Sequence, residues 1–242
     1  MAGDIPGRAT VVLVHGAWAD ASSWRRVIRH LQSDGLAVVA VQNPTTSLAD
    51  DVAATRQTLD SLDGPVVLVG HSWGGTVITE AGNHPKVSAL VYVAAFAPDA
   101  GQSTGDQVNA NPAPPGLGGV VPFGDGFLKM SADSWVNNVA QDLPEDDARV
   151  LAAVQTPLGL ATFKDKVSKA SWLDRPTWYI VSRNDRAVSV ELQRHLADRM
   201  KARTTELDAS HMSLLSQPRA VADIIGQAAS EVSKQAVLSA SA

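Results

Sequence analysis

The ten residues Val66-Val67-Leu68-Val69-Gly70-His71-Ser72-Trp73-Gly74-Gly75 decide the fold class of this chain. The apolar run before Gly70 predicts a buried strand, and the stretch after Gly75 predicts a helix. Between them lies the pattern G-x-S-x-G, whose glycines allow a sharp turn from strand to helix. Such a turn exposes the Ser72 hydroxyl at a helix N-terminus, where partial positive charge favours a developing anion. A serine carried by accident in a glycine-rich turn is the alternative, which the flanking strand and helix disfavour.

The segments around this turn repeat the order strand, then helix. Short apolar runs predict strands at 10–14, 36–41, 65–69, 87–94, 177–181 and 204–207. Apolar residues at helical spacing predict helices at 21–33, 48–62, 76–81, 144–154, 190–200 and 218–232. This alternation is typical of an α/β fold with a mostly parallel sheet flanked by helices.

One long stretch breaks this rhythm. Between residues 101 and 126, eleven of 26 residues are Gly or Pro, which excludes a long helix or strand. An insertion of this length between two sheet strands is uncommon unless it has a function, usually as a lid. We therefore expect an α/β core at residues 1–97 and 175–242 and a lid at residues 98–174. The small, polar residues 235–242 are expected to fray.

Composition excludes several classes of function. The net charge is −5, with 20 Lys and Arg against 25 Asp and Glu, and no basic cluster that would attract a nucleic acid. No apolar run approaches the roughly 18 residues that span a bilayer. Residues 1–10 lack the pattern of a secretory signal. We therefore expect a soluble, cytoplasmic protein without a membrane or nucleic-acid partner, whose oligomeric state the sequence leaves open.

Ser72 needs a base to become a nucleophile, and the chain has no cysteine that could replace it. His211 follows the last predicted strand, at the kind of strand end where this architecture places catalytic groups, and we expect it to be the base. The other histidines are assigned to helix faces, to the turn itself, to the loop after the first strand or to a loop without supporting residues: His30, His195, His71, His15 and His84.

The base in turn needs a carboxylate that fixes its tautomer and stabilises its charged form. Asp185 follows the strand predicted at 177–181, and the order Ser72, Asp185, His211 is that of nucleophile, acid and base in hydrolases of this architecture. Two alternatives stay open: Asp208, three residues before His211, and Asp99, after the fourth strand.

A tetrahedral intermediate also needs two backbone N–H groups for its oxyanion. Trp73, directly after Ser72, is expected to supply one, and Ala17 in the loop after the first strand the other. Gly16 would let that loop approach the substrate, although a simple turn is the alternative.

Aromatic and apolar residues are candidates for the substrate pocket: Trp18, Phe123, Phe127, Trp135 and Met212. They predict a small, apolar or aromatic ester, and ordinary packing under the lid is the alternative for each of them. The sequence has no metal-ligand spacing such as H-E-x-x-H and no G-x-G-x-x-G after the first strand. We therefore expect neither a metal nor a cofactor.

Four segments together resemble the α/β-hydrolase superfamily: Val12-Leu-Val-His-Gly-Ala17, Val69-Gly-His-Ser-Trp-Gly-Gly75, Asn184-Asp-Arg186 and Ser210-His-Met-Ser-Leu-Leu-Ser-Gln-Pro218. More narrowly, they resemble its branch of small bacterial esterases, plant methyl-ester esterases and plant hydroxynitrile lyases. The resemblance implies the α/β-hydrolase fold with an inserted lid, and a serine hydrolase that works through an acyl-enzyme.

Two positions in this branch separate lyases from esterases. In the lyases, the residues after the first strand resemble His-Thr, and a lysine follows the base. This chain instead has Gly16 after His15 and Met212 after His211. Ester hydrolysis is therefore the expected reaction. A lactonase, thioesterase or cofactor-free perhydrolase would use the same triad, and a ligand-binding receptor on this scaffold is the alternative outside enzymes.

Overall fold

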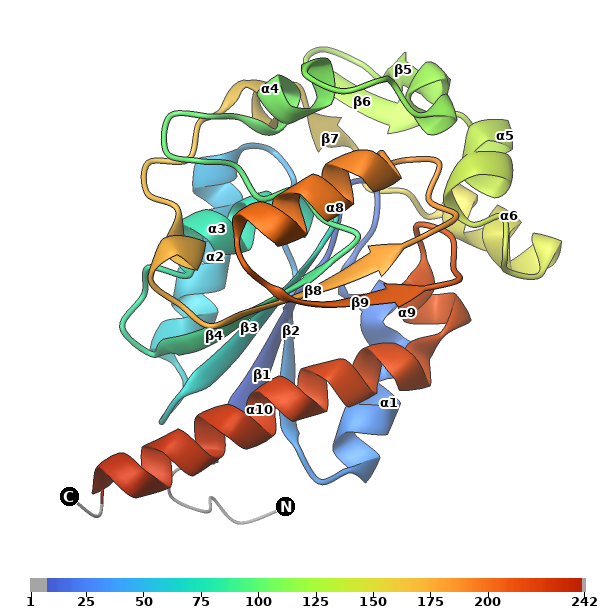
Figure 1. Ribbon diagram of the computed structural model, residues 1–242. Coiled ribbons are helices and arrows are strands. Elements are labelled where there is room, and N and C mark those ends of the chain that lie inside the picture. The colour runs from blue at the N-terminus through green and yellow to red at the C-terminus, as the bar shows by residue number, and fades with distance from the viewer. Residues whose placement is uncertain (1–7, 241–242) are drawn as a thin grey trace.

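Six short strands form a parallel sheet at the centre of the molecule, in the order β2-β1-β3-β4-β8-β9 (Figure 1). The computed structural model describes residues 8–240. The strands are β1 (Thr10–Val14), β2 (Ala37–Val41), β3 (Val66–His71), β4 (Val87–Val93), β8 (Thr177–Ser182) and β9 (Arg203–Leu207). Every residue of β3 and β8 is buried, as a parallel sheet covered on both faces requires, whereas the edge strand β9 is largely exposed. The predicted parallel α/β sheet is confirmed.

The strand order places the helices on two faces of the sheet. The chain steps from β1 to β2 in one direction and from β2 through β3 to β4 in the other. Because parallel crossovers are right-handed, this reversal puts α1 (Arg25–Ser33) on one face and α2 (Leu48–Asp60) and α3 (Trp73–Ala81) on the other. The last helix, α10 (Pro218–Ala240), packs against α1. The reversal point lies at β1, and the crevice beside its carboxyl end is where ligands bind in open α/β sheets.

The turn after β3 is tighter than the sequence alone indicates. Helix α3 begins at Trp73, three residues before its predicted start, so Ser72 alone connects strand and helix. Ser72 has a φ of 53°, and its carbonyl accepts hydrogen bonds from Gly75 N (2.9 Å) and Phe96 N (3.2 Å). A Cβ at Gly74 would lie 2.5 Å from the Val14 carbonyl oxygen, so only glycine lets α3 approach β1 this closely.

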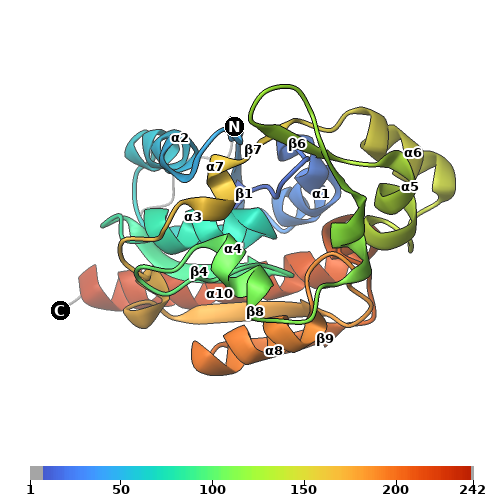
Figure 2. The same cartoon turned by 90° about the horizontal axis from the view of Figure 1, so that it is seen from above.

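Residues 94–176 connect β4 to β8 and are called the insertion below. Its elements are α4 (Thr104–Asn109), α5 (Ala132–Ser134), α6 (Glu145–Ala153), α7 (Ala161–Lys164) and a three-stranded antiparallel sheet of β5 (Val120–Pro122), β6 (Phe127–Met130) and β7 (Leu158–Gly159). Figure 1 shows the insertion in green to yellow over the sheet, and Figure 2 looks down on it. The elements between residues 101 and 126 are short, as their glycines and prolines predict. The lid function of residues 98–174 stays a prediction.

The carboxyl end of the chain differs from its prediction. Helix α10 continues to Ala240, so the expected fraying from residue 235 is wrong for residues 235–240. Small, polar residues are not a stop signal, and this stretch contains neither Gly nor Pro to end the helix. Residues 241–242, and residues 1–7 of the segment interpreted as lacking a secretory signal, lie outside the described residues. Among residues 8–240, none of the helices combines the length and hydropathy that a bilayer-spanning segment requires.

Because α3 approaches β1 closely at Gly74, adding one methyl group there should destabilise the protein. Gly74→Ala should lower the free energy of unfolding by about 1–3 kcal/mol, which corresponds to a Tm lower by about 3–10 °C. Gly118→Ala is the matched control, because a Cβ there meets no atom within 4 Å. Differential scanning calorimetry of both variants measures the difference, and equal Tm values would contradict the steric account of the turn.

Candidate active site

Ser72 lies at the bottom of a pocket between the sheet and the insertion. The strained turn presents its side chain there, with 7% of the residue exposed. His211 lines the same pocket from the loop between β9 and α10. The hydrogen bonds among residues 8–240 do not include one between the Ser72 hydroxyl and His211; in unliganded enzymes this contact is often loose and tightens with substrate.

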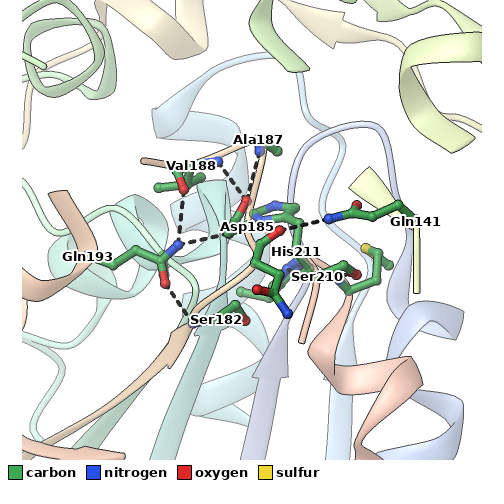
Figure 3. Close-up of polar contacts among 12 residues, drawn as sticks. Gln141, Ser182, Asp185, Ala187, Val188, Gln193, Ser210 and His211 are labelled. Carbon is green, nitrogen blue, oxygen red and sulfur yellow. Dashed lines mark hydrogen bonds and ion pairs between the residues drawn. The ribbon is translucent and has the colours of Figure 1, made fainter. Parts of the chain in front are cut away.

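His211 and Asp185 form a buried pair. Nδ1 of His211 lies 2.7 Å from Oδ2 of Asp185, whose side chain is fully buried (Figure 3). The other carboxylate oxygen, Oδ1, accepts hydrogen bonds from Ala187 N (2.8 Å) and Val188 N (2.9 Å). Because the carboxylate only accepts, Nδ1 of His211 carries a proton and Nε2 is left as the basic nitrogen. This is the geometry that a catalytic acid and base require.

The two alternative acids lie elsewhere. The side chain of Asp208 is 71% exposed and accepts a hydrogen bond from Asn184 Nδ2 (3.0 Å). Asp99 forms an ion pair with Arg199 on α8 (Val190–Arg199). Neither carboxylate contacts His211.

Two other buried histidines hold the backbone around the site. Nε2 of His71 donates to the carbonyl of His211 (2.9 Å), so the residue before Ser72 fixes the loop that carries His211. Nε2 of His15 accepts from Asn43 N (3.0 Å), so its Nδ1 donates to the Gly16 carbonyl (2.9 Å). Burial lowers the pKa of His15, and burial together with the nearby His211 lowers the pKa of His71 well below its ordinary value. Both side chains are therefore neutral.

The two residues predicted to supply the oxyanion donors line the same pocket as Ser72. Ala17 and Trp73 both line the pocket, and among residues 8–240 neither backbone N–H donates to a protein acceptor. The first N–H groups of a helix, such as that of Trp73, have no partner within the helix. A Cβ at Gly16 would lie 2.8 Å from the Ser72 Cβ and 3.0 Å from His71 Nδ1, so this position requires glycine.

A buried carboxyl group, which the sequence did not reveal, holds the side chain of Trp73. Asp51 of α2 accepts hydrogen bonds from Trp73 Nε1 (2.7 Å) and Thr45 N (2.7 Å). Burial raises the pKa of Asp51 to about 6, although both hydrogen bonds favour its charged form. In the sequence, the only sign of this contact is an aspartate on the apolar side of the helix predicted at 48–62.

Side chains of the insertion form hydrogen bonds with the loops that carry Asp185 and His211 (Figure 3). Gln141 Nε2 donates to the Asn184 carbonyl (2.7 Å), next to Asp185. The carboxylate of Asp142 accepts from both the backbone N–H (2.7 Å) and the hydroxyl of Ser210, next to His211. The insertion therefore supports the loops of Asp185 and His211 and also contributes residues to the pocket lining.

Three of the five predicted pocket residues line the pocket, and two do not. Trp18, Trp135 and Met212 line it, and Trp18 Nε1 donates to the Leu128 carbonyl of β6 (3.0 Å). Phe123 and Phe127 lie outside the lining of this pocket, contrary to the expectation. Phe123 is 46% exposed near the turn between β5 and β6, where Lys129 lies over its ring, and Phe127 starts β6 outside the pocket lining.

The remaining lining residues are mostly apolar, and sequence reasoning missed them: Ala19, Phe96, Thr104, Val108, Leu117, Met130, Val139, Leu158, Thr162, Phe163, Ala187 and Val188. Among the lining residues that the structure describes, none is Asp, Glu, Lys or Arg. Within residues 8–240, no group of three or more His, Asp or Glu side chains is arranged to hold a metal ion.

Comparison with known proteins assigns the chain to a family. The "Alpha/beta hydrolase family" matches residues 11–224. The chain belongs to the α/β-hydrolase family. This match confirms the predicted resemblance to the superfamily. Relatives named as methylesterase, hydroxynitrile lyase and polyneuridine aldehyde esterase confirm the predicted branch.

The relatives of this α/β hydrolase include hydrolases, esterases and a lyase. "Probable hydrolase R7" of a Phoma species is 28% identical, over 90% of this chain and 97% of the relative. "Alpha-hydroxynitrile lyase" of Arabidopsis thaliana is 24% identical, over 91% and 96%. "Polyneuridine aldehyde esterase" of Rauvolfia serpentina is 28% identical, over 87% and 91%. A crystal structure of polyneuridine aldehyde esterase superposes with a TM-score of 0.78 at 23% identity, over 91% of this chain and 98% of that one.

The geometry of the acid predicts a clear ranking of two variants. Asp185→Asn should lower kcat for ester hydrolysis about 10⁴-fold, because the amide would favour the wrong tautomer of His211. Asp208→Asn should change kcat less than about threefold, because its side chain is exposed and does not contact His211. Steady-state kinetics with a chromogenic ester tests this, and the reverse ranking would exclude Asp185 as the acid.

Proposed function

We propose that this α/β hydrolase cleaves carboxylic esters through a covalent acyl-enzyme, with Ser72 as nucleophile, His211 as base and Asp185 as acid. One observation carries the proposal. Ser72, in a strained strand-to-helix turn, lines the same pocket as His211, whose Nδ1 is hydrogen-bonded to the fully buried carboxylate of Asp185. Relatives named as hydrolases and esterases support the same reaction class.

In the first step, the Ser72 hydroxyl oxygen attacks the ester carbonyl carbon while Nε2 of His211 takes its proton. Asp185 stabilises the imidazolium, and the N–H groups of Ala17 and Trp73 bind the negative oxygen. The intermediate collapses as His211 gives the proton to the departing alcohol. In the second step, water attacks the acyl carbon while His211 takes one of its protons. The bond from the acyl carbon to the Ser72 oxygen then breaks, His211 returns the proton to that oxygen, and the carboxylic acid leaves.

The pocket favours small substrates with an apolar or aromatic group. Its walls carry the rings of Trp18, Phe96, Trp135 and Phe163, and no charged side chain of the lining would pair with an ionic substrate. Burying an unpaired charge there would be costly, so neutral esters are preferred. Lactones and thioesters present the same carbonyl chemistry, and a panel of p-nitrophenyl esters, methyl esters, lactones and thioesters would rank them.

Removal of the nucleophile tests the proposal directly. Ser72→Ala should lower kcat for p-nitrophenyl ester hydrolysis by about 10⁶ while leaving the fold intact, because only the attacking oxygen is lost. Circular dichroism checks the fold. More than a few per cent of wild-type activity in a pure variant would overturn the serine mechanism, and binding of esters without any turnover would support a receptor instead.

The relative named as a lyase makes cyanohydrin cleavage the competing reaction. That reaction releases cyanide, whose burial without a cation or hydrogen-bond donor costs several kcal/mol. Here the residue after the base is Met212, a buried apolar side chain of the pocket. We expect hydrolysis of short aryl esters and no cleavage of mandelonitrile above the buffer rate, measured by benzaldehyde release. Cleavage of mandelonitrile faster than any ester would reject the esterase assignment.

Met212→Lys is the informative variant for this comparison, and it should weaken ester hydrolysis by placing a charge in the pocket. Gly16→Thr, the other change towards the lyase pattern, would not isolate the chemistry. Its Cβ would lie 2.8 Å from the Ser72 Cβ and displace the nucleophile itself.

A further inference from the structure

A fully buried glutamine of α8 contacts the candidate acid. Gln193 Nε2 donates to Oδ2 of Asp185 (2.8 Å) and to the Val188 carbonyl (3.1 Å), and its Oε1 accepts from Ser182 N (3.0 Å). Figure 3 shows Asp185 between Gln193 and His211. Oδ2 is the oxygen that also receives Nδ1 of His211, so the glutamine and the base share one acceptor atom.

The surrounding backbone fixes the orientation of this amide. Ser182 N can only donate and the Val188 carbonyl can only accept, so the amide oxygen must face β8 and the NH₂ group must face Asp185. A flipped side chain would lose all three hydrogen bonds inside a buried site. The donor is therefore held towards the carboxylate whether or not substrate is bound.

We propose that Gln193 is a positioning residue that sets both the direction of the Asp185 carboxylate and the negative charge that His211 experiences. The proposal rests on the triad proposed above. It gives a function to a side chain that touches neither substrate nor the reacting atoms. Four donors hold the carboxylate, namely two backbone N–H groups, the Gln193 amide and His211, and the first three are neutral.

The electrostatic effect has a definite sign. A hydrogen-bond donor on a carboxylate disperses its charge, so the carboxylate stabilises the imidazolium of His211 less strongly. Removing the donor makes His211 hold its proton more tightly, and a higher pH is then needed to form the neutral base. The groups that face this pair are His71, whose ring lies 4.6 Å from that of His211, and Tyr179 of β8, whose pKa is raised by burial and by the nearby Asp185 carboxylate. Asp142 of the insertion contacts Ser210 beside the base.

Two variants test the proposal on the full-length enzyme. Gln193→Met removes the donor and keeps the side-chain length. We expect kcat for a p-nitrophenyl ester to fall about tenfold with little change in KM, and the acid limb of kcat/KM against pH to move up by about half a unit or more. Gln193→Leu also removes the donor, with a branched apolar side chain in its place. Its acid limb should move up by a similar amount, which keeps the test intact if the methionine variant does not fold.

Gln107→Met is the matched control. Gln107 is a buried glutamine that accepts from Ala97 N (3.1 Å) and donates to the Ala97 carbonyl (3.0 Å), without contact to a titratable group of the triad. Its loss should lower thermal stability and leave the acid limb in place. A merely structural function of Gln193 would give this same result.

The outcomes separate this inference from the proposed function. An unshifted acid limb in both folded Gln193 variants overturns the positioning function, whatever their kcat. A shift of the same size in Gln107→Met also overturns it. If the wild-type enzyme shows no ester turnover that depends on Ser72, the proposed function fails, irrespective of Gln193.

Discussion

The backbone conformation of Ser72 is the constraint on which the site depends. A non-glycine residue with a φ of 53° and a ψ of −122° is strained, at a cost of about 1–3 kcal/mol, and persists only where its surroundings over-determine it. Here Ser72 N donates to the Val93 carbonyl, and the Ser72 carbonyl accepts from Gly75 N and Phe96 N. Gly74 in addition lets α3 lie against β1. The same turn brings the serine, the Trp73 N–H and the loop after β1 to the crevice where the direction of the sheet connections reverses.

Asp185 and His211, the proposed acid and base, come from separate loops and need support that the turn does not give. Asp185 is held by backbone N–H groups and Gln193, and the loop of His211 is held by His71 on one side and by Asp142 of the insertion on the other. The insertion is thus part of the scaffold that holds Asp185 and His211 in place. The network is buried, so each lost partner leaves an unsatisfied polar group and not merely a weaker contact.

The sequence predicts the parts of this molecule that depend on local order. Strands, helices and the G-x-S-x-G turn follow from apolar periodicity and glycine spacing, and the loops of Asp185 and His211 follow from their positions after strands. Pocket lining in the insertion does not follow, because alternating residues of a short hairpin face opposite sides. This is why the sequence alone does not show that Phe123 and Phe127 lie outside the pocket lining. The hydrogen bonds of Asp51 to Trp73 and of Gln193 to Asp185 depend on tertiary contacts. In the sequence, the only sign of them is a polar residue on the apolar side of each helix.

Trapping of the acyl-enzyme tests the central claim most directly. Enzyme mixed with excess p-nitrophenyl butyrate and quenched in acid within milliseconds should gain the mass of one butyryl group. Peptide mapping should place that group on Ser72, and the burst of p-nitrophenol should match the enzyme concentration. Turnover without a covalent adduct, or an acyl group on another residue, would contradict a mechanism built on the strained turn at Ser72.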